Sequence, residues 1–232
     1  MTIGGYAMTH LEFWGTVLYL WSVWLVGRGS IWTWPIGNVA VVLYAVLFWR
    51  IRLYADLAEQ VYFFVAGFYG WWAWWRRGRG AAAGEGGLPI GYGSRQANAV
   101  WLAVIVVGSA LSTLALRRVH LWLPLWFPEP AAYPLLDVST TIMSFVAMIL
   151  MAWRRVECWY LWLLVDVVDI GLYAAKEVWL LSAVYVLFLV LAIKGLRHWR
   201  ALATAEIANA SGTLGTGTAK QSADTPGQGA PA

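Results

Sequence analysis

The stretch CWYLWLLVDVVDIGLYAA, residues 158–175, decides the fold class, because it is apolar over almost the length of a membrane span yet carries two acids at its centre. An ionised side chain at the middle of a transmembrane helix costs roughly 2.5–3.5 kcal/mol, so an acid in that place marks a functional site by default. Spacings of three and four residues keep side chains on one face of a helix. The face that holds both acids comprises Trp159, Trp162, Asp166, Asp169, Tyr173 and Lys176.

The composition agrees with an integral membrane protein. Of the 232 residues, 61% are hydrophobic and 12% are charged, whereas soluble domains carry about 25% charged residues. The single cysteine, Cys158, excludes an internal disulfide and a metal site built from cysteines. The net charge of +4 comes from arginines between apolar segments, where they set membrane orientation, so we expect no nucleic-acid partner.

Apolar segments recur along the chain and predict an all-α integral membrane fold, with a single transmembrane domain over residues 1–203. Each segment is long enough to cross a bilayer when tilt and polar ends are allowed for. The small and polar residues from 204 to 232 predict a disordered cytoplasmic tail. The seven predicted helices cover residues 11–27, 32–49, 57–75, 97–116, 134–152, 158–175 and 179–196.

The chain also contains a weak internal repeat. Four residues of the third segment recur in the seventh at the same spacing, and an aromatic pair of the second segment recurs in the sixth. This pattern predicts two parallel three-helix repeats, about 11–80 and 134–200, joined by a linker helix over 97–116, with the cargo bound mid-membrane between the repeats. The matched sets are Gln60, Phe63, Gly70 and Trp74 with Tyr185, Phe188, Gly195 and Trp199, and Trp34 and Tyr44 with Trp162 and Tyr173. Trp159 is a second counterpart of Trp34, because it follows Asp137 by the same 22 residues by which Trp34 follows Glu12.

Polar and aromatic side chains on the inward faces of these segments form the candidate site. A buried polar group without a partner in hydrocarbon is costly, which favours binding roles for Asn38, Gln60 and Asp166. Aromatic residues at helical spacing also serve as bundle packing, and tryptophans at segment ends form an interfacial belt. The candidate substrate-binding residues are Trp34, Asn38, Gln60, Phe63, Trp162, Asp166, Tyr173, Tyr185 and Phe188. The candidate gating or structural residues are Pro35, Gly37, Tyr44, Gly70, Trp74, Asp169, Lys176, Gly195 and Trp199.

Four blocks of the sequence carry a family resemblance: WPIGN (34–38), YADLAEQVYFFVAGFYGWWAW (54–74), WLLVDVVDIGLYAAK (162–176) and YVLFLVLAIKGLRHW (185–199). They resemble the signature blocks of the PnuC family of bacterial nicotinamide riboside transporters. The resemblance implies a three-plus-one-plus-three helix fold similar to that of SWEET sugar transporters, a homotrimer, and a place among the lipids of the bacterial inner membrane. It further implies facilitated diffusion of nicotinamide riboside with trapping by cytoplasmic phosphorylation, and neither a cofactor nor an enzymatic activity.

Nicotinamide riboside also suits the candidate residues chemically. Its pyridinium ring is attracted to aromatic faces by about 0.5–2 kcal/mol, and we expect Trp34 and Trp162 to supply those faces. Gln60 or Asn38 would pair with the carboxamide, and Asp166 with the ribose hydroxyls. The basic residues lie in the loops, so the free riboside suits the site better than the phosphorylated mononucleotide.

Two other interpretations stay open on the residues alone. A transporter of another aromatic vitamin or nucleoside, such as thiamine or riboflavin, would use the same features. A membrane-embedded metal-dependent transferase would use Asp166 and Asp169, but it needs a second acidic pair and a basic cluster at the same depth, which the sequence does not offer.

The basic residues predict the orientation in the membrane. When alternate loops are assigned to opposite sides, eleven Lys and Arg residues fall on one side and five on the other. Because cytoplasmic loops are enriched in Lys and Arg, we expect the N-terminus outside and the C-terminus in the cytoplasm. A reporter enzyme fused to the C-terminus should therefore give its cytoplasmic signal, and a periplasmic signal would reject this orientation.

Overall fold

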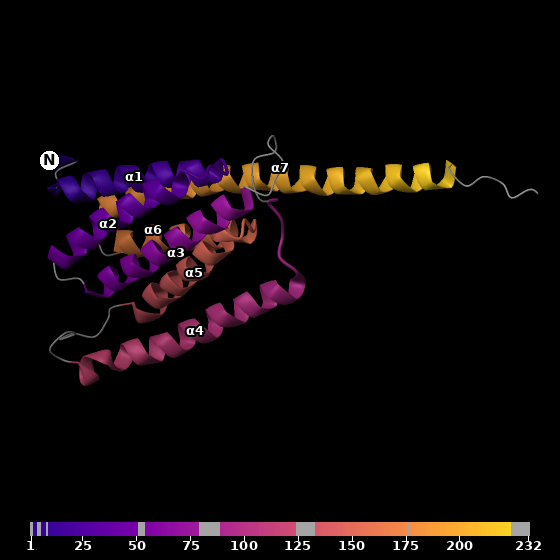
Figure 1. Ribbon diagram of the computed structural model, residues 1–232. Helices are drawn as coiled ribbons and strands as arrows, with labels where there is room; N and C mark the ends of the chain where they lie inside the picture. Colours follow the sequence, from indigo (N-terminus) through magenta and orange to yellow (C-terminus); the bar gives the residue numbers. More distant parts are fainter. Residues whose placement is uncertain are drawn as a thin grey trace, which may run out of the picture.

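The computed structural model describes residues 2–3, 6–7, 9–50, 54–78, 89–123, 133–175 and 177–223. Within these ranges the chain is almost entirely helical (Figure 1). A short antiparallel strand pair, β1 (Thr2–Ile3) and β2 (Tyr6–Ala7), precedes the helices. The helices are α1 (His10–Gly27), α2 (Thr33–Arg50), α3 (Tyr54–Gly78), α4 (Arg95–Trp122), α5 (Pro134–Ala152), α6 (Glu157–Ala175) and α7 (Trp179–Ala223).

Each predicted apolar segment coincides with one of these helices, so the all-α prediction is confirmed. Four helices have the length and mean hydropathy of a membrane span, namely α4, α5, α6 and the Trp179–Ala208 part of α7. The described parts of α1, α2 and α3 do not reach the same mean hydropathy. They are rich in Trp, Tyr and Gly, which add little to such a scale although Trp and Tyr suit the membrane interface.

Local sequence signals explain where several helices begin. The Thr9 side chain accepts a hydrogen bond from the Glu12 N–H at 3.1 Å, and the Glu12 carboxylate accepts one from the Thr9 N–H at 3.4 Å. This reciprocal pair satisfies N–H groups that a helix start leaves without partners. Ser94 caps α4 by accepting from the Ala97 N–H. Pro134 stands in the first turn of α5, where the missing N–H loses no bond.

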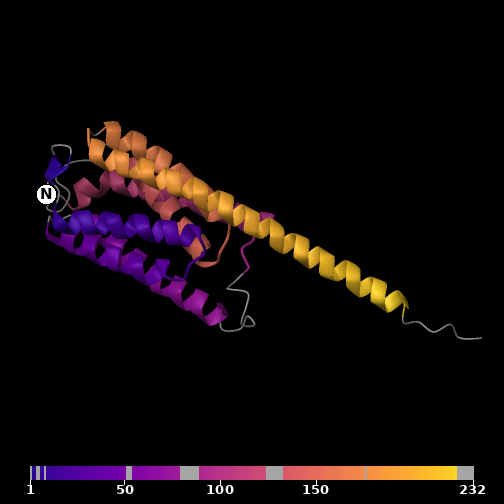
Figure 2. The same cartoon turned by 90° about the horizontal axis from the view of Figure 1, so that it is seen from above.

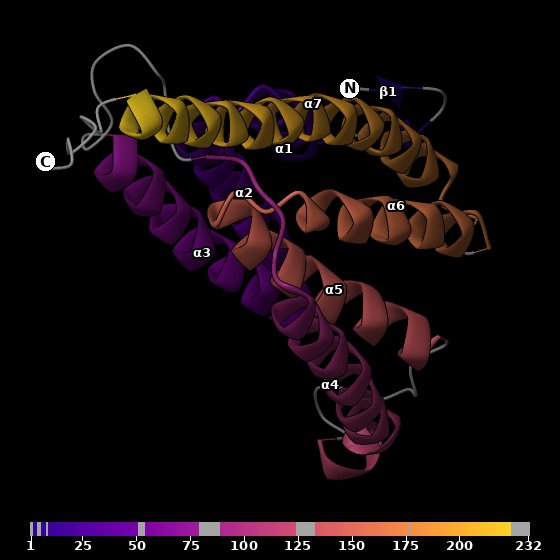
Figure 3. The ribbon, with the colours of Figure 1, turned by 90° about the vertical axis from the view of Figure 1, so that its right-hand side faces the viewer.

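Six of the helices form a ring. α2 contacts α1 and α3, α6 contacts α5 and α7, and the ring closes where α3 meets α5 and where α1 meets α7. α4 lies outside the ring and packs against α5 (Figure 3). The interior of the bundle is therefore bounded by α1–α3 on one side and by α5–α7 on the other.

The last helix is longer than the sequence predicts. α7 continues to Ala223 and projects beyond the other helices (Figures 1 and 2), whereas a disordered tail is predicted from residue 204. No proline interrupts the chain between Trp179 and Ala223, and the next one is Pro226. Proline is the strongest helix breaker, so nothing in the backbone forces the helix to end with its apolar part.

Two equivalent contacts between a tryptophan and a glycine set the spacing inside the ring. Trp34 on α2 packs against Gly70 on α3, and Trp159 on α6 packs against Gly195 on α7. The second pair follows the first by 125 residues. A Cβ atom at either glycine would overlap the indole ring. The structure therefore matches Trp34 with Trp159, one of the two counterparts that the sequence pattern offers, and not with Trp162.

Two tryptophan side chains tie the two sets of three helices together. The indole N–H of Trp74 on α3 donates to the carbonyl of Ala152, the last residue of α5, at 3.0 Å. The indole N–H of Trp199 on α7 donates to the carbonyl of Val26, near the end of α1, also at 3.0 Å. Each bond joins the third helix of one set to the first helix of the other, so both seams of the ring are bonded at the same end of the bundle.

Replacing Gly195 by Ala should destabilise the protein, because the added methyl group overlaps the Trp159 ring and overpacking costs about 1–3 kcal/mol. Gly171→Ala is the matched control, since no side chain or distant backbone atom lies within 4 Å of a Cβ at that position. Thermal denaturation of the purified protein in detergent should show a lower Tm for Gly195→Ala and an unchanged or higher Tm for Gly171→Ala. Equal Tm values for the two variants would contradict the close contact.

Candidate functional site

The two acids singled out by the sequence, Asp166 and Asp169, are buried on α6, with 4% and 6% of their surface exposed. Their carboxylates lie within electrostatic range of each other, and Asp169 is also within range of Glu59 on α3. Helices from both sets therefore bring acidic side chains together in the interior of the ring. Lys176, predicted on the same face, lies outside the described residues. Among the residues that the structure describes, no group of three or more His, Cys, Asp or Glu side chains is arranged to hold a metal ion.

Aromatic side chains border these acids. The rings of Tyr173 and Tyr185 stack, with centroids 5.4 Å apart and planes at 15°. Phe188 meets Tyr185 edge-on, with centroids 5.9 Å apart. Both tyrosines lie within electrostatic range of Asp169 and Glu59. The structure thus brings three predicted site residues of α6 and α7 together beside the acids, where ring faces and negative charge both favour a cation.

Gln60 is buried, and its side-chain oxygen is engaged within the protein. The Tyr19 hydroxyl on α1 donates to Gln60 Oε1 at 2.8 Å. The Tyr19 ring lies 5.4 Å from the ring of Tyr44, and the Tyr44 hydroxyl shares a hydrogen bond of 2.6 Å with Thr16 Oγ1. Since one of the two lone pairs of Oε1 accepts from Tyr19, the amide nitrogen, which is a donor, is the group of Gln60 that this hydrogen bond leaves unused.

Three of the predicted site residues carry a buried N–H donor that has no hydrogen-bond partner among the described residues. These donors are Trp34 Nε1, Asn38 Nδ2 and Trp162 Nε1, and Trp159 Nε1 is in the same state. A buried donor without an acceptor costs about 1–3 kcal/mol. Such groups are uncommon in native structures and need an explanation, which an acceptor on a bound molecule would provide.

Other predicted residues make contacts typical of helix packing. Phe63 lies against Phe145 of α5, with ring centroids 6.0 Å apart. Gly37 lies where a Cβ would come within 2.8 Å of Ser22 Oγ on α1. Pro35 stands in the first turn of α2. The first contact joins α3 to α5 and the second joins α2 to α1, so Phe63 and Gly37 both take part in helix packing.

Four buried tryptophans form a continuous cluster at one end of the ring. Trp34 meets Trp74 at right angles, with centroids 5.3 Å apart, and Trp159 meets Trp199 in the same way at 5.5 Å. Trp74 and Trp199 lie 6.3 Å apart. We call these four residues the tryptophan cluster. It contains both cross-ring indole bonds, so it fills the interior where the two sets of helices meet.

Arg154, in the turn between α5 and α6, covers the tryptophan cluster. Its guanidinium lies 4.5 Å from the centroid of the Trp74 ring, and Nη2 donates to the Gly29 carbonyl at 3.2 Å. The residue is 5% exposed, and this burial lowers the pKa of the guanidinium. Arg154 and Gly29 lie 125 residues apart and both have positive φ, 55° and 70°. The two turns are therefore equivalent, but only the second places a cation over the cluster.

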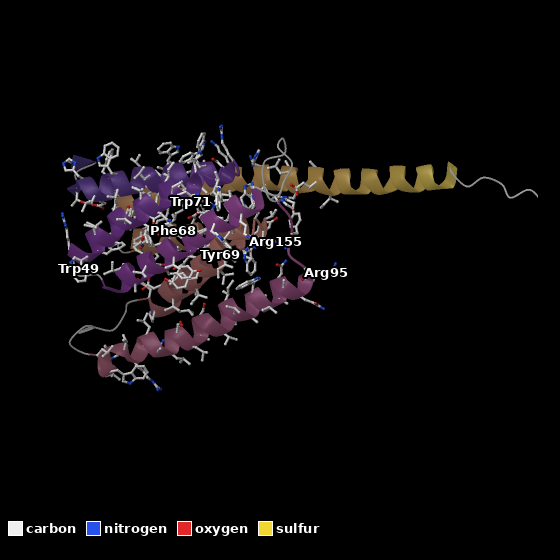
Figure 4. The ribbon with its side chains drawn as sticks, viewed as in Figure 1. Trp49, Phe68, Tyr69, Trp71, Arg95 and Arg155 are labelled. Carbon is white, nitrogen blue, oxygen red and sulfur yellow. The ribbon has the colours of Figure 1, made fainter. Side chains whose placement is uncertain are left out.

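The outer faces of the helices fit a membrane environment. Phe68 and Trp71 are exposed side chains of α3 (Figure 4). Trp49 lies at one end of the bundle, and Arg95 and Arg155 lie toward the other, which is the end of the tryptophan cluster (Figure 4). Exposed aromatic residues at helix ends and arginines beyond them are typical of the membrane interface.

The comparisons with known proteins decide the family. A model of the nicotinamide mononucleotide transporter family matches residues 9–201. The chain belongs to this family. The nicotinamide riboside transporter PnuC of Escherichia coli (strain K12) is 33% identical over 211 residues, which cover 84% of this chain and 87% of the relative. The riboflavin/roseoflavin transporter RibM of Streptomyces davaonensis is 30% identical over 186 residues, which cover 80% of this chain and 82% of RibM.

A solved structure supports the fold. The crystal structure of the vitamin B3 transporter PnuC matches with a TM-score of 0.64 at 24% identity, covering 84% of this chain and 82% of the other. The resemblance to PnuC proteins is therefore confirmed. Members of this family are transporters, so the protein is a multi-pass membrane transporter and not an enzyme.

Three residues that contact the acids, Gln60 or the tryptophan cluster lie off the helical faces that the sequence singles out. Glu59 is the neighbour of Gln60, and adjacent residues of a helix point about 100° apart, so the face containing Gln60 does not include it. An acid inside an apolar segment is nevertheless a signal in itself. Tyr19 lies in the middle of α1, where one tyrosine among apolar residues gives no signal. From the sequence, Arg154 is interpreted only as one of the basic loop residues that set the membrane orientation, whereas the structure shows it to be buried.

The indole bonds should hold this end of the ring closed, and Cys158 can report on them. This single cysteine is fully buried in the same core cluster as Trp74 and Trp199. Replacing both tryptophans by Phe removes two hydrogen bonds worth about 0.5–1.5 kcal/mol each. We expect Cys158 to react with a thiol reagent about tenfold faster in the double variant.

The control is Trp72→Phe, which changes an exposed tryptophan of α3, the helix that also carries Trp74. Its labelling rate should equal that of the wild type. An unchanged rate in the double variant, with the folded protein intact by gel filtration, would show that these bonds do not hold the end closed.

Proposed function

We propose that the protein takes up nicotinamide riboside, bound mid-membrane inside the ring of helices. The observation that carries this proposal is the convergence of carboxylates from α3 and α6 beside the stacked Tyr173 and Tyr185 rings. Nicotinamide riboside is a flat pyridinium cation, and aromatic faces and carboxylates are the groups that attract such a ring. The E. coli relative is named as a transporter of the same compound.

The individual roles follow from the donors and acceptors at the site. Trp34 and Trp162 face the pyridinium ring, and Asp166 accepts hydrogen bonds from the ribose hydroxyls. Gln60 or Asn38 holds the carboxamide by donating to its oxygen. The engaged Oε1 of Gln60 and the unpaired Nδ2 of Asn38 among the described residues support donor roles for both amides.

The charges in the interior favour the riboside over the mononucleotide. Among the described buried residues, the charged side chains are Asp166, Asp169 and Arg154. Arg154 lies over Trp74 and donates to a backbone carbonyl, at the end of the ring and not beside the acids. A phosphate group next to the acids would be repelled, because like charges repel strongly in a medium of low dielectric constant.

The transport cycle uses the two sets of helices as parallel repeats. We place α1–α3 and α5–α7 in a three-plus-one-plus-three, SWEET-like arrangement with α4 as the linker, and the equivalent tryptophan and glycine contacts support this arrangement. Trp74 and Trp199, with Gly70 and Gly195 against the neighbouring indole rings, act as the gate at one end. Tyr44 lies about 15 Å further along α2 than Trp34, against Tyr19 and Thr16. Transport is facilitated diffusion, and phosphorylation in the cytoplasm traps the cargo.

The location and assembly follow the family resemblance. We place the protein in the bacterial inner membrane as a homotrimer, with the N-terminus outside and the C-terminus in the cytoplasm. The clustering of Arg95 and Arg155 at the end of the tryptophan cluster (Figure 4) supports this orientation, because cytoplasmic ends carry the excess of basic residues.

A second candidate cargo is riboflavin, because the relative RibM is named as a riboflavin/roseoflavin transporter. Riboflavin also has a flat ring system and a polyhydroxylated chain, so aromatic faces and amide donors suit it. It carries no positive charge, however, and gains nothing from buried carboxylates. The acids of α3 and α6 therefore favour the pyridinium cargo.

Replacing Asp166 by Asn tests the proposal directly, since it keeps the shape and removes the charge. A hydrogen bond to a charged group is worth about 1.5–3 kcal/mol, so we expect the affinity for nicotinamide riboside to fall about tenfold or more. Isothermal titration calorimetry on the purified full-length protein measures this affinity. Gln60→Ala and Trp162→Ala should weaken binding as well.

The control is Trp122→Ala, which changes a 62% exposed tryptophan at the end of α4 and should leave the affinity unchanged. Parallel titrations with riboflavin, thiamine and nicotinamide distinguish the cargoes. Unaltered binding in Asp166→Asn would show that Asp166 does not contact the cargo. Tighter binding of riboflavin than of nicotinamide riboside by the wild type would identify riboflavin as the cargo.

A further inference from the structure

The outer surface of the seam between α1 and α7 carries an apolar groove of about 520 Å³. Four of its side chains are between 41% and 52% exposed, so the groove faces away from the interior of the ring and toward the bilayer. The lining residues, all apolar, are Leu20, Trp21, Trp24, Leu187, Val190 and Leu191.

The groove arises because the two helices cross closely at one level and separate at another. Gly27 and Gly195 meet backbone to backbone, since a Cβ on Gly27 would lie 3.4 Å from the Gly195 Cα. Toward their N-terminal ends α1 and α7 move apart (Figure 2). The crossing therefore closes the groove at one end, and the neighbours of the two glycines, Arg28 and Lys194, stand at that same level.

These two cations lie on the faces that line the groove. Arg28 follows Trp24 by four residues and Lys194 follows Val190 by four, so each cation is one helical turn beyond a lining residue. Both side chains are exposed. The Arg28 guanidinium lies 4.1 Å from the centroid of the Trp24 ring. Stacking on the ring face leaves the edge of the guanidinium, which carries its N–H donors, free to meet an oxyanion.

We propose that this groove is a binding site for one anionic phospholipid, with an acyl chain in the groove and the phosphate on Arg28 and Lys194. The distances along α1 fit a lipid whose phosphate lies at Arg28. At a rise of about 1.5 Å per residue, Trp24 lies about 6 Å and Leu20 about 12 Å along the helix from Arg28. A phosphate at the level of the cations thus places the first part of its acyl chain against the indole and leucine side chains.

The pairing of charge with an apolar groove distinguishes this lipid from other occupants. A groove without cations would accept the chain of any lipid, whereas basic residues beside a groove between transmembrane helices favour anionic headgroups. A second copy of the chain would fit this face only if it brought acidic side chains to Arg28 and Lys194, because a charge buried without a partner is costly. The site goes beyond cargo binding, since it lies outside the ring.

Native mass spectrometry of the full-length protein, delipidated in detergent, tests the site. The probes are dioleoyl phosphatidylglycerol, which is anionic, and dioleoyl phosphatidylcholine, which has the same chains without net charge. The wild type should bind one phosphatidylglycerol with about tenfold preference over phosphatidylcholine. Arg28→Gln with Lys194→Gln should lower the affinity for phosphatidylglycerol about tenfold or more, because each basic residue near a membrane surface contributes roughly a fivefold factor.

Two further variants serve as controls. Arg117→Gln with Arg118→Gln removes two exposed charges from α4 and should leave the preference intact. Leu187→Trp fills the groove and should weaken binding of both lipids. The proposal is overturned if the wild type binds the two lipids equally, if the α4 variant loses as much affinity as the α1–α7 variant, or if Leu187→Trp leaves lipid binding unchanged. A change of oligomer mass in Leu187→Trp with lipid binding retained would assign the groove to a second copy.

Discussion

The contact of an indole ring with a glycine backbone, made once in each set of three helices, is the constraint on which the rest of the structure depends. Trp34 against Gly70 and Trp159 against Gly195 hold the second and third helices of each set at close range. This spacing places Trp74 and Trp199 where their N–H groups reach carbonyls across the ring. Because the ring is closed in this way, the inward faces of α3, α6 and α7 converge on one interior, where carboxylates and aromatic rings lie together.

The helical fold was largely predictable because a membrane leaves few alternatives. Every backbone N–H and C=O in hydrocarbon must be paired internally, so apolar segments of the right length form helices. The contacts between helices were less predictable. A pattern with period 3.6 identifies a face but not the element that it meets, so the sequence left Trp159 and Trp162 as counterparts of Trp34, and only the contact with Gly195 distinguishes them. The extent of α7 was also missed, because polar, Ala-rich sequence does not by itself end a helix.

In the candidate site, too, single residues were predictable from the sequence, whereas contacts between helices were not. Asp166, Asp169, Asn38 and Gln60 were identifiable because polar groups are costly in hydrocarbon, and all four are buried. Glu59 and Tyr19 were missed because their importance depends on helices far apart in the sequence. Phe63, predicted among the binding residues, also packs its ring on Phe145 at the contact between α3 and α5, which the sequence pattern does not indicate. Which inward residues meet a cargo and which only pack depends on tertiary contacts.

The two indole hydrogen bonds run in opposite directions between the two sets of helices. Trp74 has its acceptor at Ala152 and Trp199 has its acceptor at Val26, so each set of three helices supplies a donor to the other and receives one in return. Reciprocal contacts of this kind are those of an isologous two-fold dimer. Three of the helices alone would leave their indole donor without its acceptor, so neither set of three completes its hydrogen bonds without the other.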